Sequence, residues 1–313
     1  MPERIQMPAA DGFPLGGYQW RHAVRTEADS PPLLIINAAT SVRCRYYARF
    51  AEYLHLHGWD VITYDYRGIG ESRQGSLRRL RADWIDWGQH DFEGVLRYAR
   101  QTFPGKALDV IGHSIGGFVI GLARSAHCIR RIFTMGAQFA YWRDYHSDKR
   151  LAMFLKWHML MPVIAMLLGY VPAKRLGWME DTPKGVALDW ARMAPRFEDS
   201  VRRSRQTPEG ISQAQELALN FKTISAPILA LGMDDDPYGT EAALDRLLRY
   251  YTASQRCHLR LTPHDLGWEK IGHFAFFHED CRDILWPYAL EWLRHAALPE
   301  YLPGRLRIMP PGR

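Results

Sequence analysis

The stretch Leu108–Leu122 reads LDVIGHSIGGFVIGL and contains the pattern Gly-x-Ser-x-Gly from Gly112 to Gly116. The apolar run at its start favours a buried strand, and the residues from Gly116 onward are typical of a helix. A serine between such a strand and helix lies on a sharp turn that exposes its hydroxyl, and flanking glycines leave room for that turn. Ser114 is therefore a candidate nucleophile.

Strand-like and helix-like segments alternate on both sides of this stretch. Strands are expected at 33–37, 61–64, 108–111, 131–135, 228–231 and 258–261, and helices at 46–57, 84–103, 116–125, 241–251 and 280–295. This alternation predicts an α/β fold with a mostly parallel open sheet and helices on both faces. Asp11-Gly12 predicts a tight turn between two antiparallel edge strands. The proline- and arginine-rich tail after His295 is expected to be loosely held.

The strand signal is missing between Phe139 and Lys222. Aromatic, methionine and arginine residues occur there in helix-compatible runs that several prolines interrupt. Because a chain of 313 residues can form one large α/β domain with an insertion, we predict a core of residues 1–138 and 223–313 with an inserted helical cap, or lid, of residues 139–222.

The composition excludes several classes of protein. Hydrophobic residues make up 47% and charged residues 24%, which is ordinary for a globular chain. The four cysteines form no Cys-x-x-Cys pair, so we expect neither disulfides nor a zinc cage, and a cytoplasmic location. The net charge is +6, but the basic residues are scattered and accompany no nucleic-acid motif, so no nucleic-acid partner is expected.

No targeting or membrane-spanning segment is expected. Met1–Met7 lacks the apolar run of a secretory signal. Trp157–Ala173 is apolar, but it contains Pro162 and Gly169 and falls short of the ~20 residues that a spanning helix requires. We expect a buried or lid helix there, with weak contact between the lid and a membrane surface as the alternative.

Partners for a serine nucleophile follow at the expected kind of position. A serine hydroxyl needs an imidazole to take its proton, and the imidazole needs a carboxylate to orient it. Gly232-Met233-Asp234-Asp235-Asp236 places three carboxylates at the carboxyl end of a predicted strand, where α/β sheets bind ligands. His273 follows in the loop Ile271-Gly272-His273-Phe274. The order is therefore serine, acid, histidine.

These features together resemble the α/β-hydrolase superfamily from about Trp20 to His295. The segment Asp65–Ser72, DYRGIGES, is similar to the Asp-x-Arg-Gly-x-Gly-x-Ser loop of many members, and we expect it to brace the site. The long helical insertion looks like the lid of the monoglyceride-lipase-like and serine-aminopeptidase-like branch. The resemblance implies an α/β-hydrolase fold and a serine hydrolase.

The resemblance also selects an acid among the three aspartates. In the superfamily the acid usually lies three residues after the glycine that ends the strand, which selects Asp235 when the count starts at Gly232. Asp234 and Asp236 are adjacent, and spacing alone leaves both of them open.

An oxyanion hole needs backbone N–H groups, and one normally belongs to the residue after the nucleophile, here Ile115. For the second donor, position matching points to Ala39. Family members usually have His-Gly where this chain reads Asn37-Ala38-Ala39-Thr40. Side-chain donation by Asn37 or Thr40 is therefore the alternative.

The expected reaction is hydrolysis of a carboxylic ester of a small-molecule acyl substrate, with a covalent serine intermediate. In this scheme His273 deprotonates Ser114 and Asp235 orients His273. Amide, thioester or carbon–carbon bond hydrolysis and acyl transfer use the same residues and stay open, as does a non-catalytic binding protein. No cofactor and no metal is expected, since His264, His278 and Glu279 fit no zinc spacing.

Overall fold

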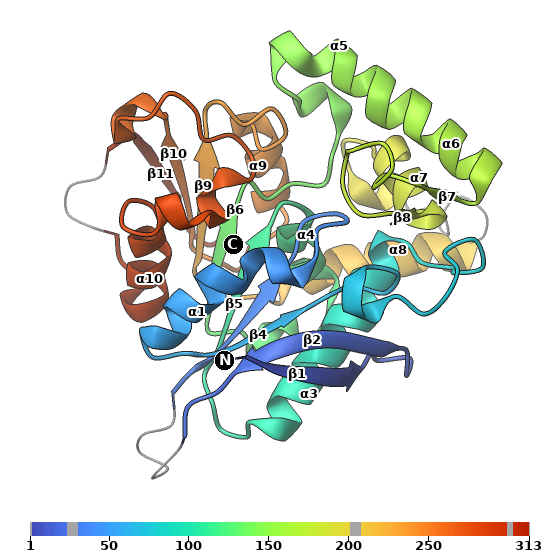
Figure 1. The fold of residues 1–313 in the computed structure, drawn as a ribbon. Helices are drawn as coiled ribbons and strands as arrows, with labels where there is room; N and C mark the ends of the chain where they lie inside the picture. The colour runs from blue at the N-terminus through green and yellow to red at the C-terminus, as the bar shows by residue number, and fades with distance from the viewer. Residues whose placement is uncertain (1, 24–30, 201–207, 299–302, 313) are drawn as a thin grey trace.

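The computed structural model describes residues 2–23, 31–200, 208–298 and 303–312 (Figure 1). Within them, nine strands form one sheet in the order β1-β2-β4-β3-β5-β6-β9-β10-β11. Their bounds are β1 Glu3–Pro8, β2 Pro14–Trp20, β3 Leu33–Asn37, β4 Asp60–Tyr64, β5 Leu108–His113, β6 Arg131–Met135, β9 Ile228–Met233, β10 Arg256–Leu261 and β11 Arg305–Met309. The six strands from β4 to β10 run parallel, which confirms the predicted α/β fold.

The edges of the sheet are antiparallel. The hairpin β1–β2 pairs Met7 with Leu15 around the predicted turn at Asp11-Gly12. At the other edge β11 pairs with β10, so the expectation of a loosely held tail was wrong. The outer side of β10 would otherwise expose unpaired backbone groups, and the tail satisfies them as a ninth strand.

Helices cover both faces of the sheet. Their bounds are α1 Ala48–Leu56, α2 Trp84–Asp86, α3 Glu93–Thr102, α4 Ile115–Leu122, α5 Arg150–Met153, α6 Met161–Leu168, α7 Lys184–Arg192, α8 Pro208–Lys222, α9 Glu241–Leu248 and α10 Trp286–His295. Figure 1 shows α1 and α10 on the near face and α3, α4 and α8 on the other. The strands between these layers are buried on both sides, as is usual for parallel sheets.

The chain between β6 and β9, which we call the insertion, is mainly helical. Helices α5, α6 and α7 and a short ribbon of β7 (Tyr170–Val171) and β8 (Thr182–Pro183) lie above the carboxyl ends of the strands (Figure 1). Helix α8 instead packs against the core helix α4. The predicted cap boundaries at 139 and 222 stay a prediction, and residues 201–207 of that segment lie outside the described residues.

One helical stretch of the insertion is unusually apolar at its surface. Ser147–Leu168 is, among the described residues, the helix that is long and apolar enough to cross a membrane by length and composition alone. Its mean hydropathy is 1.8, and only 28% of its most apolar window is buried. Most of its apolar side chains therefore do not belong to the protein core.

Candidate active site

Ser114 occupies the turn between β5 and α4, as the sequence predicts. Its backbone has φ 54° and ψ −121°, a left-handed conformation that costs a non-glycine residue energy. A Cβ on Gly112 would lie 2.7 Å from the Cα of Gly117, and one on Gly116 would collide with the carbonyl oxygen of Asn37. The glycines on both sides of the serine are therefore required by space.

A buried carboxylate contacts the histidine of the Gly-His loop. Asp236 Oδ2 lies 2.6 Å from His273 Nδ1, and Asp236 Oδ1 accepts hydrogen bonds from the backbone N–H groups of Tyr238 (2.8 Å) and Gly239 (2.9 Å). Burial alone would raise the pKa of Asp236, but the charge and hydrogen bond of His273 and the two N–H groups lower it. Asp236 is thus a charged acceptor that fixes the orientation of the imidazole.

The choice of Asp235 as the acid was wrong by one residue. Its carboxylate accepts hydrogen bonds from the backbone N–H groups of Ile271 (2.8 Å) and Gly272 (2.9 Å), so it anchors the histidine loop. The error comes from the predicted end of the strand, because β9 continues to Met233. Three residues after this strand end is Asp236.

Asp234 has a different partner. Its carboxylate forms an ion pair with the Arg260 guanidinium at 2.8 Å. The three consecutive aspartates therefore serve three different purposes: an ion pair, an anchor for a loop and a partner for His273.

The loop after β6 brings the serine and the histidine loop together, and sequence reasoning missed it. Gly136 has φ 56°, and a Cβ there would lie 2.8 Å from Asp236 Oδ2 and 3.1 Å from His273 Cε1. Two residues on, Gln138 Nε2 donates to Ser114 Oγ at 3.4 Å. The sequence signal for this loop was the presence of Gly136 and Gln138 directly after the predicted strand 131–135.

Ser114 and His273 line the same cavity, although no hydrogen bond joins them in this structure. Catalytic hydrogen bonds often form only in the substrate complex. Both residues are nearly buried, at 7% exposure each. A side-chain movement that joins them would therefore take place inside the cavity.

The predicted oxyanion donor Ala39 is already engaged. Its N–H donates to the Tyr47 hydroxyl at 2.9 Å. The N–H of Thr40 has no acceptor within the described part of the chain, and Thr40 lines the cavity. Ile115 is the first residue of α4, where an N–H has no intrahelical partner. Ile115 and Thr40 are therefore the available pair of donors.

The side chain of Asn37 does not serve the cavity. Asn37 is fully buried, its Nδ2 donates to the Gly116 carbonyl at 3.4 Å, and its Oδ1 accepts from the Tyr64 hydroxyl at 2.9 Å. Where the family usually has histidine, this chain uses an amide to hold the elbow against the sheet.

A buried chain of hydrogen bonds continues from Ala39 to the histidine loop. The Tyr47 hydroxyl lies 2.8 Å from His113 Nδ1, and His113 Nε2 lies 2.9 Å from the His273 carbonyl oxygen. Because a carbonyl only accepts, Nε2 carries the proton and Nδ1 accepts from Tyr47. Burial lowers the pKa of His113 well below its usual value, which agrees with a neutral ring.

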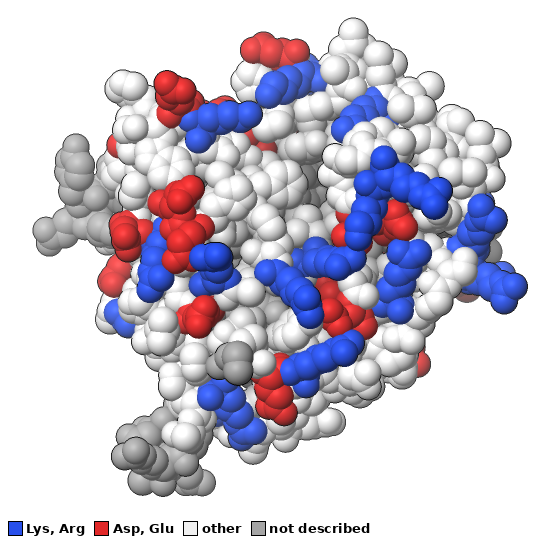
Figure 2. All heavy atoms as spheres, viewed as in Figure 1, with Lys and Arg blue, Asp and Glu red and all other residues white. Residues whose placement is uncertain are grey.

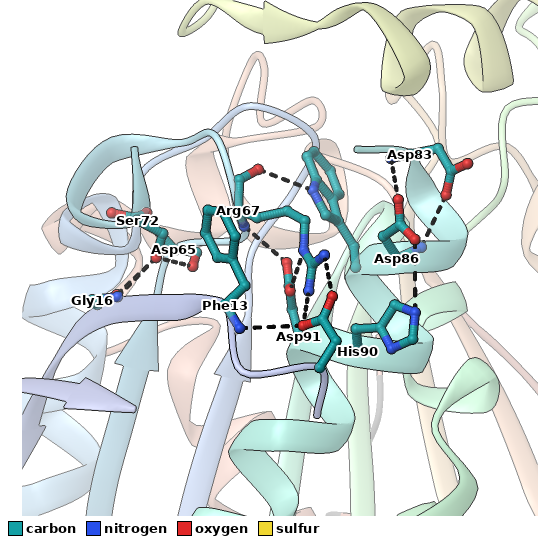
Figure 3. A network of polar contacts seen from close by, with 11 residues as sticks. Phe13, Gly16, Asp65, Arg67, Ser72, Asp83, Asp86, His90 and Asp91 are labelled. Atoms are coloured by element: carbon teal, nitrogen blue, oxygen red, sulfur yellow. Dashed lines mark hydrogen bonds and ion pairs between the residues drawn. The ribbon is translucent and has the colours of Figure 1, made fainter. Parts of the chain in front are cut away.

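The Asp65–Ser72 loop is joined by a polar network to the turn between β1 and β2 and to the helical segment Trp87–Phe92 (Figure 3). Arg67 Nε donates to the fully buried Asp91 at 2.6 Å, and the same guanidinium contacts Asp11 at 2.8 Å. Ser72 Oγ donates to the Asp65 carbonyl at 2.6 Å. Burial raises the pKa of Asp91 to about 7, while hydrogen bonds from Arg67 lower the pKa of Asp11 to about 2. No atom of this network lines the cavity.

The cavity above Ser114 has a volume of about 600 Å³, within the range of small-molecule sites. Several large aromatic side chains line it, among them Trp84, Trp157, Trp178, Trp190 and Tyr238. The rings of Trp157 and Trp190 are stacked with their centroids 4.8 Å apart. The site is therefore a chamber with aromatic walls that polar and charged side chains also line.

A separate group of side chains offers metal-ligand atoms. Atoms of His22, His55 and Asp60 lie within 4.8 Å of one another. However, His55 Nδ1 lies 3.0 Å from the Trp59 carbonyl oxygen, and the Lys106 ammonium forms an ion pair with Asp60. This arrangement is satisfied by internal contacts, and it does not favour a cation.

Comparison with known proteins identifies the family of this chain. Residues 40–265 match the model of the family Hydrolase_4, described as serine aminopeptidase, S33, and the chain belongs to this family. The matched range includes Ser114 and Asp236 and ends before His273. The protein is thus an α/β serine hydrolase by family. No curated protein matches.

Solved structures share the fold at low identity. An esterase from Pyrococcus furiosus is 12% identical with a TM-score of 0.58, and the match covers 95% of this chain and 91% of that one. A putative lipase from Acinetobacter baumannii is 16% identical, with a TM-score of 0.57 and coverage of 94% and 91%. A puromycin-hydrolyzing peptidase from Mycobacterium tuberculosis is 14% identical, with a TM-score of 0.57 and coverage of 97% and 41%.

Proposed function

We propose that this protein hydrolyses carboxylic esters through an acyl-enzyme. Ser114 Oγ attacks the acyl carbon while His273 takes its proton, and the tetrahedral intermediate then expels the alkoxide, which His273 protonates. Water next attacks the acyl-enzyme and gives a proton to His273, and collapse of the second tetrahedral intermediate releases the carboxylic acid while His273 returns the proton to Ser114 Oγ. Asp236 holds His273 in the required tautomer throughout.

One observation carries this proposal. The strained elbow of Ser114 and the Asp236–His273 pair, at 2.6 Å, converge on one walled cavity from three different loops. A protein that only binds ligands has no chemical need for this combination. The N–H groups of Ile115 and Thr40 are proposed as the oxyanion donors, since the negative charge develops next to the serine.

The charge of the cavity favours an ester over the amino terminus of a peptide. An aminopeptidase needs a carboxylate to bind a protonated amine. The acidic residue on the cavity wall is Glu180, and Arg43 neutralises it at 2.8 Å. Amide and thioester hydrolysis and acyl transfer follow the same first step, so they are alternatives for the assay to separate.

Labelling with a fluorophosphonate probe tests the nucleophile. We expect the wild-type protein to be labelled and the Ser114→Ala variant, folded to the same extent by circular dichroism, to remain unlabelled. Folded wild-type protein that resists the probe would support a binding protein instead. A series of p-nitrophenyl esters with matched anilides and thioesters then identifies the acyl bond, and added alcohol acceptors reveal transfer.

We also propose that the outer face of Ser147–Leu168 rests on a lipid surface. Leu151, Leu155, Val163 and Leu167 are spaced by four or eight residues and are exposed by 53% to 79%. The surface over α6 carries few charged side chains (Figure 2). Exposed cations lie near both ends of the helix, with Lys149 in its first turn and Lys174 and Arg175 after its last residue. Apolar burial and attraction to anionic headgroups therefore act at the same face.

Flotation with phosphatidylcholine vesicles, with and without phosphatidylglycerol, tests the lipid contact. We expect binding that increases with the anionic lipid and falls in the variant Leu155→Ser/Leu167→Ser, and release of bound protein by carbonate. Resistance to carbonate would indicate a spanning helix, and equal flotation of the variant would exclude this face. A cytoplasmic location stays a prediction.

A further inference from the structure

Lys156 is a charged residue of the cavity wall without a charged partner. It lies in the π-helical turn Phe154–Leu160 between α5 and α6, and it lines the same cavity as Ser114. The other charged wall residues, Arg43 and Glu180, pair with each other at 2.8 Å. Among the described residues, no carboxylate lies within ion-pair distance of the Lys156 ammonium.

Two indole rings hold the ammonium in place. Lys156 Nζ lies 4.2 Å from the ring centroid of Trp157 and 4.5 Å from that of Trp178, and both rings line the cavity. A lysine that only covers aromatic surface would lay its methylene chain on the ring and extend its charge into water. Here the charged nitrogen itself is on the rings.

The surroundings of Lys156 favour binding of an anion by its ammonium group. The rings attract the cation, but they supply no hydrogen-bond acceptor for its three N–H groups. Burial lowers the pKa of Lys156, with no acidic neighbour to oppose the shift. A carboxylate entering the cavity would provide the missing acceptor, at a place where electrostatic interactions are stronger than in open water.

We propose that Lys156 is a specificity-determining residue that selects esters carrying a carboxylate on the acyl or the alcohol part. This inference rests on the proposed ester hydrolysis and names its substrate class. The class comprises monoesters of dicarboxylic acids, and hydroxy acids that are acylated on the hydroxyl group and keep a free carboxylate. The carboxylate binds to the Lys156 ammonium between the two indoles while the ester group lies at Ser114. Neutral esters of equal size bind without this contact.

Matched pairs of esters test the proposal on the full-length protein. The first pair is the mono-p-nitrophenyl ester of an α,ω-dicarboxylic acid and the p-nitrophenyl ester of the monocarboxylic acid with the same chain length. The second pair is a 4-acyloxybenzoate and its methyl ester. In at least one pair we expect kcat/KM to favour the anionic ester, and Lys156→Met to reduce this ratio roughly 10- to 100-fold, as for a hydrogen bond to a charged group.

Control variants separate charge from folding. Lys156→Arg keeps the charge and should keep most of the preference, whereas Lys222→Met removes an exposed charge outside the cavity wall and should leave the ratio unchanged. Hydrolysis of all four esters with no preference, or a preference that survives Lys156→Met, would overturn the inference alone. If the wild type hydrolyses none of them and no probe labels Ser114, the proposed function fails instead.

Discussion

The base and the roof of the cavity are built in opposite ways. At the base, the titratable side chains that orient His273 are buried and partnered: Asp236 accepts three hydrogen bonds, and His113 uses both ring nitrogens. In the roof, the insertion presents indole rings to the cavity and bare leucines to the outside, and its Lys156 has no acidic partner.

This difference follows from what each region has to do. Proton transfer and oxyanion binding require fixed donors and acceptors, and a buried polar group keeps its position only when every hydrogen bond is satisfied. Substrate selection and surface contact require groups that are left for an outside partner. The base should therefore respond to mutation with loss of rate or stability, and the roof with changed preference.

The largest effect is expected from the acid at the base. Asp236→Asn should lower kcat by roughly 10³- to 10⁴-fold, as in the serine-protease triad, because the amide favours the wrong tautomer of His273. Asp235→Asn, which changes an adjacent carboxylate that contacts only backbone N–H groups, should lower kcat far less. Steady-state assays on both variants decide between them, and the reverse order would restore Asp235 as the acid.

The next effect concerns stability. Arg67→Ala leaves the fully buried Asp91 without its cation, so the free energy of unfolding should fall by about 3–5 kcal/mol. Arg43→Ala breaks the more exposed pair with Glu180 between core and insertion, and it should cost no more than about 1 kcal/mol. Urea unfolding of both variants measures the contrast, and equal losses would contradict the distinction between a buried and an exposed ion pair.

A smaller effect is expected from a residue that positions the base of the cavity and takes no part in the reaction. Tyr47→Phe removes the hydroxyl that joins the Ala39 N–H to His113 Nδ1. Two buried polar groups then lose a partner, which should cost about 1–3 kcal/mol of stability. We expect kcat to fall while KM changes little, because the substrate does not contact this hydroxyl. An increase in KM at unchanged kcat would place Tyr47 in the binding site instead.

The sequence predicts the base of the cavity better than its roof. Ser114 and His273 follow from a strand–turn–helix pattern and from residue order, since those depend on local backbone geometry. The acid was off by one residue because the count of three started at Gly232, whereas β9 ends one residue later, at Met233. The prediction of Ala39 as an oxyanion donor was wrong for another reason. Its N–H donates to the hydroxyl of Tyr47, which belongs to a different segment of the chain.

The structure of the roof depends on contacts between distant residues, which local sequence patterns do not predict. Within the insertion, helical propensity and prolines indicate helices, but they do not say which faces turn inward. The position of Lys156 on two indole rings requires Trp157 and Trp178 to meet, and these residues are 21 positions apart. Periodicity alone therefore predicts an apolar helix here and does not predict that Lys156 lies on the cavity wall.

The smallest effect compares one buried histidine from each region. Burial lowers the pKa of His113 at the base and of His158 in the insertion, where Nδ1 lies 2.9 Å from the Ala191 carbonyl oxygen. In the unfolded chain both rings bind protons below about pH 6.5, while the folded rings stay neutral, so the unfolded state gains protons and stability falls as the pH decreases.

Replacing either ring with glutamine should therefore flatten the dependence of stability on pH. Each variant should lose up to about 1.4 kcal/mol per pH unit of slope below pH 6.5. The change should be larger for His113→Gln, because its pKa is lowered further. Urea unfolding at several pH values between 5 and 7 measures the slopes. A wild-type slope retained in His113→Gln would mean that this ring takes up its proton in the folded state, and that the base is less rigid than its hydrogen bonds indicate.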